Sequence, residues 1–173
     1  MPTANIKTEY AAYESVMYSA SLHSLASSAT AGWCSGYENN TSNKYLDAIV
    51  NWTIDPANTA PANDKAFYLF GYGMSSLSYY PSTGAATGGT VGTEGALTFP
   101  NITTTPILLK LIDTLYYSTA DVALNSSSFS MCKRMGWRRL PMYWGVAVLN
   151  YSGAALAASG NRIAWYGSYD TVT

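Results

Sequence analysis

The sequence predicts an all-β protein that folds as one antiparallel sandwich or barrel. Several short segments alternate apolar and polar residues with the period of two that is typical of a half-buried strand. Turn-forming residues separate these segments at intervals of about ten residues. The chain has 173 residues, of which 48% are hydrophobic, so a single domain can bury a sizeable core. We expect an N-terminal arm over residues 1–10, loose or wrapped over a neighbour, and one domain over 11–173.

The clearest strand covers residues 45–54. One face of this segment is apolar and holds Leu46, Ala48, Val50, Trp52 and Ile54. The other face is polar, with Ile49 as the exception. Residues 55–58 end the strand, because Pro56 cannot donate to a ladder and Asn58 favours turns.

Four further strands follow along the chain. Residues 65–72 and 142–149 are apolar on both faces, which indicates central strands. Turn residues at 150–153 and 159–161 enclose a short predicted strand over 154–158, and residues 162–169 form the last strand.

Two segments leave alternatives open. Residues 106–120 fit both a helical stripe and a strand. No capping box precedes them, and two aromatic residues with β-branched neighbours follow the apolar stripe within the segment, so we expect a strand. Residues 73–95 predict one long loop rich in Gly, Ser and Thr. Tyr79 and Tyr80 within it are candidate interface residues, equally compatible with anchoring a partner and with a plain surface excursion.

The composition indicates a protein whose surface is covered by other proteins. Charged residues make up only 11% of the chain, against about a quarter in ordinary soluble domains, while fifteen residues are tyrosine. Tyrosine combines a large ring with a polar tip and is enriched at interfaces. The net charge of −1 gives no field of one sign to attract nucleic acid or an acidic membrane.

No segment predicts secretion or a membrane span. The polar start, residues 1–7, lacks the apolar run of a secretory signal. Residues 66–93 and 140–161 carry no charge for over twenty positions, but glycine, proline and polar residues interrupt both. We therefore expect no membrane partner. Cys34 and Cys132 could pair across two strands, and we favour free, buried thiols.

The residue types that catalysis requires are nearly absent. His23 is the only histidine and lies in an alternating segment, 21–26, where a strand histidine is more often structural than catalytic. The carboxylates that a glycosidase would need are scattered as Asp47, Asp55, Asp64, Asp113 and Asp121. No metal-binding spacing and no phosphate-binding loop occurs. We expect no enzyme, no catalytic or metal residue and no cofactor.

One basic cluster stands out, and it supplies further candidate interface residues: Lys133, Arg134, Trp137, Arg138 and Arg139. An aromatic ring among arginines can stack on the bases of single-stranded nucleic acid. The alternative is a basic loop that pairs with acidic groups of a neighbouring subunit, which suits the multi-donor arginine head. Without a broader basic face we favour the subunit contact over nucleic acid.

Several motifs carry a resemblance. The C-terminal part reads Leu140-Pro-Met-Tyr-Trp-Gly145, an apolar strand to Asn150, Ser152-Gly-Ala-Ala-Leu156 and Tyr166-Gly167; earlier motifs are Ser24-Leu-Ala-Ser27, Ala31-Gly-Trp33 and Asp47-Ala48. Together they resemble small jelly-roll virion structural proteins of tailed bacteriophages, of the capsid decoration or cement type. The resemblance covers about two thirds of the length, and its motifs are structural.

The resemblance implies a jelly-roll-like β-sandwich subunit made in the host bacterial cytoplasm. It implies a homo-oligomer, which we expect to be a trimer, on the exterior of the capsid, where it bridges capsomers of the major capsid protein. The alternative is a tail or neck component, either an adaptor or a jelly roll that binds a receptor glycan. Exposed aromatic rings would then stack on sugars, and the candidates are Tyr79, Tyr80, Tyr116 and Tyr117.

Overall fold

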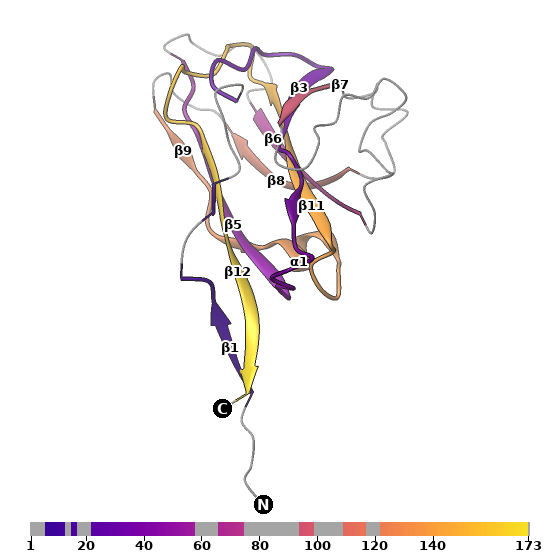
Figure 1. Cartoon of the computed structure of the whole chain (residues 1–173). Coiled ribbons are helices and arrows are strands. Elements are labelled where there is room, and N and C mark those ends of the chain that lie inside the picture. The colour runs from indigo at the N-terminus through magenta and orange to yellow at the C-terminus, as the bar shows by residue number, and fades with distance from the viewer. Residues whose placement is uncertain are drawn as a thin grey trace, which may run out of the picture.

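Two antiparallel β-sheets pack face to face as a sandwich (Figure 1). The structure, a computed structural model, describes residues 6–12, 15–16, 22–57, 66–74, 94–98, 109–116 and 122–172. These residues are almost all in strands and connecting turns, with one short helix, α1 (Met131–Met135). The antiparallel, jelly-roll-like β-sandwich predicted from the sequence is confirmed.

Sheet A has the strand order β1-β12-β5-β10, with β2 pairing β12 and β9 pairing β5. Its strands are β1 (Ile6–Tyr10), β2 (Ser15–Val16), β5 (Asp47–Ile54), β9 (Leu124–Asn125), β10 (Phe129–Ser130) and β12 (Arg162–Val172). Sheet B has the order β7-β3-β11-β6-β8, with β4 pairing β11. Its strands are β3 (Ala31–Cys34), β4 (Glu38–Asn39), β6 (Ala66–Met74), β7 (Gly95–Thr98), β8 (Lys110–Tyr116) and β11 (Tyr143–Tyr151).

The core lies between the two sheets, and the apolar face predicted from the alternation over residues 45–54 faces it. Every second residue of β5, from Ala48 to Ile54, is buried, while the residues between them are half-buried on the outer face. Each sheet also contributes large aromatic side chains to the core. Trp144 of β11 meets Trp165 of β12 edge to face, with ring centroids 5.1 Å apart. This contact joins sheet B to sheet A in a geometry that aromatic quadrupoles favour.

Two predicted strands are turns in the structure. Residues 154–158 contain only an isolated bridge between Leu156 and Pro56. The reason is local: the Asn150 amide and the Ser152 hydroxyl both donate to the Ala154 carbonyl, at 2.8 and 3.0 Å. Side-chain hydrogen bonds of this kind compete with a ladder. Likewise, the alternating segment around His23 forms a turn at 22–24.

The boundaries of other predicted segments shift. Residues 110–116 of the ambiguous segment form β8, which settles strand over helix for that part. Residues 73 and 74 extend β6, and β7 begins at Gly95, so both ends of the predicted 73–95 loop belong to strands. The interior of that loop, with Tyr79 and Tyr80, lies outside the described residues.

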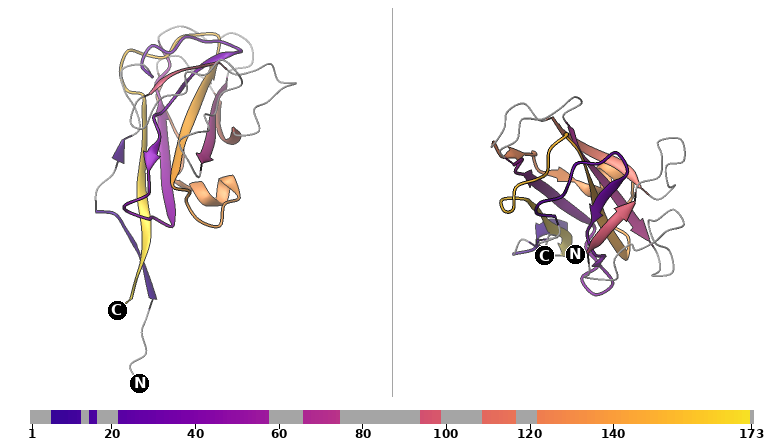
Figure 2. Two further views of the ribbon diagram at one scale, coloured as in Figure 1. Left: turned by 45° about the vertical axis from the view of Figure 1, so that its right-hand side comes forward. Right: turned by 90° about the horizontal axis from the view of Figure 1, so that it is seen from above.

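The N-terminal segment forms a two-stranded ribbon with the C-terminus. Residues 6–10 of the predicted arm are β1, which pairs in register with β12 from Ile6–Val172 to Tyr10–Ser168. On the other side of β12, the pairing with β5 ends at Ser168–Asp47. Beyond that pair the ribbon extends away from the sandwich, and Figures 1 and 2 show it as a projection at one end. Residues 6–10 are therefore tied to the chain's own C-terminal strand.

Candidate interaction surface

The predicted basic loop begins with helix α1, which fixes where its charges lie. The Ser130 hydroxyl accepts a hydrogen bond from the Lys133 backbone N–H at 2.9 Å and caps the N-terminus. Gly136 ends the helix in the left-handed conformation, with φ of 76°. Met131 and Cys132 are buried beneath the helix. Lys133 and Arg134 are consequently exposed on its outer side.

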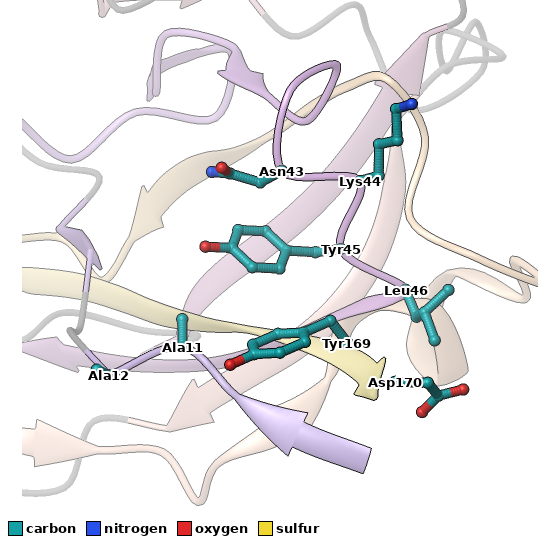
Figure 3. A pocket seen from close by; sticks show the side chains of 8 residues that line it. All are labelled: Ala11, Ala12, Asn43, Lys44, Tyr45, Leu46, Tyr169 and Asp170. Carbon is teal, nitrogen blue, oxygen red and sulfur yellow. The ribbon is translucent and has the colours of Figure 1, made fainter. Parts of the chain in front are cut away.

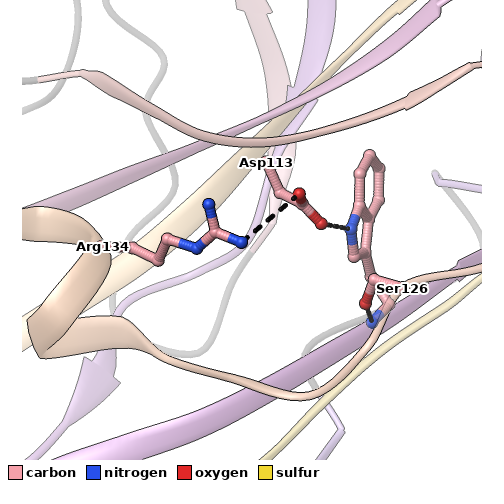
Figure 4. A network of polar contacts seen from close by, with 4 residues as sticks. Asp113, Ser126 and Arg134 are labelled. Carbon is pink, nitrogen blue, oxygen red and sulfur yellow. Dashed lines mark hydrogen bonds and ion pairs between the residues drawn. The ribbon is translucent and has the colours of Figure 1, made fainter.

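Arg134 has an ionic partner within the chain. Its guanidinium lies 4.0 Å from the carboxylate of Asp113 on β8, and 5.3 Å from the Phe129 ring centroid. The second oxygen of Asp113 accepts a hydrogen bond from the Trp52 indole N–H at 2.8 Å (Figure 4). Because Trp52 belongs to sheet A and Asp113 to sheet B, this network connects both sheets to α1. Arg134 therefore has a structural role besides its predicted place at an interface.

Trp137 packs against the sandwich. It is half-buried and lies over Gly73 of β6, where a Cβ would approach its ring to 2.6 Å. Glycine at this position allows the indole to close over the strand. The ring thus packs with the core residues, and this packing leaves less of its surface available to stack on nucleic-acid bases.

Among the remaining cationic side chains of the cluster, Arg139 borders an apolar hollow. Lys133, Arg138 and Arg139 are exposed. A hollow of about 580 Å³ lies between Arg139 and Lys44, and its lining includes Leu46 and Met142. Leu46 is 39% exposed and Met142 50% exposed.

Backbone hydrogen bonds hold the two walls of this hollow together. Asn40 N–H donates to the Met142 carbonyl at 2.8 Å, and Leu140 N–H donates to the Leu46 carbonyl at 2.8 Å. These bonds hold the backbone of the hollow in place. We define the basic–apolar surface as Lys44, Leu46, Arg139 and Met142, which line the hollow, together with the exposed neighbour Arg138. It combines exposed apolar area with positive charge, a mixture that suits a protein partner with acidic groups.

The ribbon presents a second exposed apolar surface. Ile6, Thr8 and Tyr10 face Val172, Asp170 and Ser168 across the two strands, on the face opposite the core residue Trp165. Ile6 is 74% exposed, Val172 72% and Tyr10 59%. Thr8 donates a hydrogen bond to Asp170 at 2.7 Å, and Lys7 pairs with Glu9 at 3.2 Å on the other face. The sequence alone does not reveal this surface, because it forms only when β1 pairs with β12.

The other predicted candidates are separate or structural. Tyr116 is 76% exposed at the end of β8, while Tyr79, Tyr80 and Tyr117 lie outside the described residues. The His23 ring accepts a hydrogen bond at Nδ1 from the Asn161 amide at 3.2 Å, since that amide nitrogen can only donate. Asp47 accepts from the backbone N–H of Ala48 and of Cys132, at 2.8 and 2.9 Å. Within the described part of the chain, no group of three or more His, Cys, Asp or Glu side chains is placed to hold a metal.

Both thiols are free and buried, as favoured from the sequence. The Cys132 thiol lies 3.3 Å from the Leu46 carbonyl, and Cys34 lies 3.5 Å from the Gly95 carbonyl. Burial, followed by the neighbouring Asp47 carboxylate, raises the pKa of Cys132 to about 12. The thiolate is strongly disfavoured, so this cysteine is held as a small apolar group.

Comparison of the chain with protein-family models, curated proteins and solved structures finds no match in any of the three. Among the described residues, the helical content includes no segment with the length and apolarity that crossing a bilayer requires.

Proposed function

We propose that the chain is a structural subunit of a bacteriophage virion, of the capsid decoration type. In this role it forms a homo-oligomer, most simply a trimer, and stabilises the shell by bridging neighbouring capsomers of the major capsid protein. The observation that carries the proposal is the ribbon of β1 and β12, which projects from the sandwich with Ile6, Tyr10 and Val172 exposed.

The ribbon supports an assembly role for physical reasons. An isolated two-stranded ribbon is marginally stable in water, and exposed strand edges favour pairing or packing with another chain. Burying the three exposed apolar side chains against a second copy removes that area from water and stabilises both copies. The low charge of the whole chain, 11%, favours the same interpretation, because a subunit in a permanent assembly keeps little solvated surface.

The basic–apolar surface provides the second contact that bridging requires. It lies at the same end of the sandwich as the ribbon. Leu46 immediately precedes β5, and the first residue of β5, Asp47, pairs with Ser168 of β12, where the ribbon begins. In the proposal, the ribbon joins copies of the chain, and Arg138 and Arg139 face acidic groups of the capsid protein.

Binding to capsids that lack the protein tests the proposal. We expect the purified chain to oligomerise in light-scattering measurements and to bind such capsids at saturating, icosahedral copy number in cryo-EM. The double variant Ile6→Asp and Val172→Asp places charges on the ribbon face and should yield monomers that bind far more weakly. Val122→Asp is the matched control, since Val122 is 50% exposed away from both surfaces.

The contrary outcome is clear. If the chain stays monomeric at high concentration and does not bind capsids, it is not a decoration protein. Density of this fold at the neck or tail, and none on the capsid, would assign it to the adaptor or receptor-binding class.

A further inference from the structure

A second pocket, of about 780 Å³, lies at the base of the ribbon, between the segment after β1 and the segment before β5 (Figure 3), and it adjoins the hollow described above through Lys44, Tyr45 and Leu46. Asn43, Tyr45, Tyr169 and Asp170 line it together with Ala11. Its volume is within the range of small-molecule sites, which combine apolar walls with a few polar groups. From the side chains that line it, we propose that this pocket binds a neutral saccharide, a function beyond the assembly role.

Two tyrosine rings form the aromatic wall of the pocket. The centroids of the Tyr45 and Tyr169 rings are 6.3 Å apart, and the rings are tilted by 40°. The Tyr45 ring packs directly on Gly167, where any Cβ would clash with it, and its edge meets Trp165 at a centroid distance of 5.8 Å. These contacts hold one side of Tyr45 against β12. Both rings are half-buried and leave aromatic surface at the pocket, against which the C–H face of a pyranose can pack.

Hydrogen bonds hold the backbone around the Tyr45 and Tyr169 rings in place without a ligand. The buried Asn40 side chain accepts from the Tyr45 N–H at 2.7 Å and donates to the Tyr45 carbonyl at 3.0 Å. Leu46 N–H donates to the Ser168 carbonyl at 2.7 Å, and Ala11 N–H donates to the Gly167 carbonyl at 2.8 Å. Both walls are thus anchored to β12. A site that needs no ordering on binding loses less affinity to conformational entropy.

The polar groups are arranged for hydroxyl-rich ligands. In Figure 3 the hydroxyls of Tyr45 and Tyr169 and the amide of Asn43 point to one side of the pocket. None of these three groups makes a hydrogen bond to another described residue. Hydroxyl and amide groups both donate and accept, as sugar hydroxyls do.

The charges at the pocket favour a neutral ligand. Lys44 and Asp170 carry opposite charges and point away from the side to which the tyrosine hydroxyls point (Figure 3). Asp170 already accepts a hydrogen bond from Thr8. No excess of positive charge is therefore directed at a carboxylate or phosphate group within the pocket.

Protein-observed NMR titration of the full chain with glucose, galactose, mannose and N-acetylglucosamine tests the proposal, and an array of neutral glycans extends it to longer ligands. We expect at least one saccharide to give saturable shifts at Asn43, Tyr45 and Tyr169. Tyr169→Ala should weaken that binding about tenfold or more. Tyr166→Ala is the matched control and should leave it unchanged, because Tyr166 is on the same strand but on the outer face, opposite Ile49.

A second variant keeps the test decisive if Tyr169→Ala does not fold. Asn43 is exposed in a turn, so Asn43→Ala should fold and still weaken binding. The proposal is overturned if no glycan binds, or if binding is unchanged in both the Asn43 and the Tyr169 variants.

Discussion

Glu38 is a carboxyl group whose charged form the fold disfavours. It lies on β4 of sheet B, and its carboxylate faces the indole of Trp165 in sheet A. Burial raises the pKa of this carboxyl above its ordinary value, and the Trp165 N–H lowers it again in part. The folded protein therefore holds the Glu38 proton more tightly than the unfolded chain does.

This difference predicts how stability depends on pH. As pH rises from the ordinary value of 4.5 through the higher pKa of folded Glu38, the unfolded chain releases its proton first. The contribution of Glu38 is thus fully present at low pH and is lost across that window. Glu38→Gln should raise the free energy of unfolding at pH 7 by less than about 1 kcal/mol, since the group keeps some solvent contact. Urea denaturation of both proteins at pH 4 and pH 7 measures the free energy of unfolding. If Glu38→Gln is less stable than the original protein at pH 7, burial does not disfavour the charge of Glu38.

Cys132 gives a second prediction at the level of a single residue. With a pKa of about 12, its thiol remains protonated at pH 8, and Cys34 is fully buried. We expect iodoacetamide to modify neither cysteine in the native protein at pH 8 and both after unfolding in guanidinium. Intact mass spectrometry over time gives the result. Rapid modification of one thiol under native conditions would show that the region around it opens.

At the scale of elements, Asp113 links β8 to both β5 and α1. Asp113→Ala leaves the indole N–H of the buried Trp52 without its acceptor, which should destabilise the fold by about 1–3 kcal/mol. Asp113→Asn keeps an oxygen acceptor and should recover most of the loss. Arg134→Ala should cost less than about 1 kcal/mol, because its 4.0 Å ion pair is half exposed. Thermal and urea unfolding of the three variants tests this order, and an equal loss in all three would refute it.

The sequence predicts elements where the pattern is regular. The alternation over 45–54 predicts β5 within two residues, and the apolar runs predict β6 and β11. Helix α1 escapes the pattern because five residues are too few to show a helical period. Its signals are the Ser130 cap and the left-handed Gly136, six positions apart. The segment at 154–158 is predicted wrongly because the side chains of Asn150 and Ser152 take its backbone partners.

At the scale of the whole molecule, the protection of backbone amides should fall from the sandwich to the ribbon. The β11 amides pair within sheet B between β3 and β6, whereas residues 169–172 of β12 pair only with β1 among the described strands. In dilute solution we expect ribbon amides to exchange fastest and β11 amides slowest. At concentrations where the chain oligomerises, ribbon protection should rise. Hydrogen–deuterium exchange at several protein concentrations measures this protection. If the protection of the ribbon amides does not change with concentration, the ribbon has no role in assembly.

The candidate surfaces depend on long-range contacts, which limits what sequence reasoning finds. The cluster at 133–139 is visible in the sequence as a run of charge. Its residues differ in the structure, because Trp137 packs against β6 and Arg134 pairs with Asp113 of β8, whereas Arg138 and Arg139 stay exposed. The pocket brings Tyr45 next to Tyr169 across most of the chain, through pairing of β5 with β12. Neither tyrosine stands out in a sequence with fifteen of them.

The pairing of β1 with β12 also bears on the order in which the protein folds. Ile6 and Val172 are partners although most of the described chain lies between them, so Ile6 is synthesised well before Val172. A nascent chain therefore carries β1 without its own partner strand until β12 leaves the ribosome. During that interval β1 would be able to pair with the β12 of another chain whose own β1 is not yet bound to it. Such an exchange of β1 between chains would form the same hydrogen bonds as the pairing within one chain.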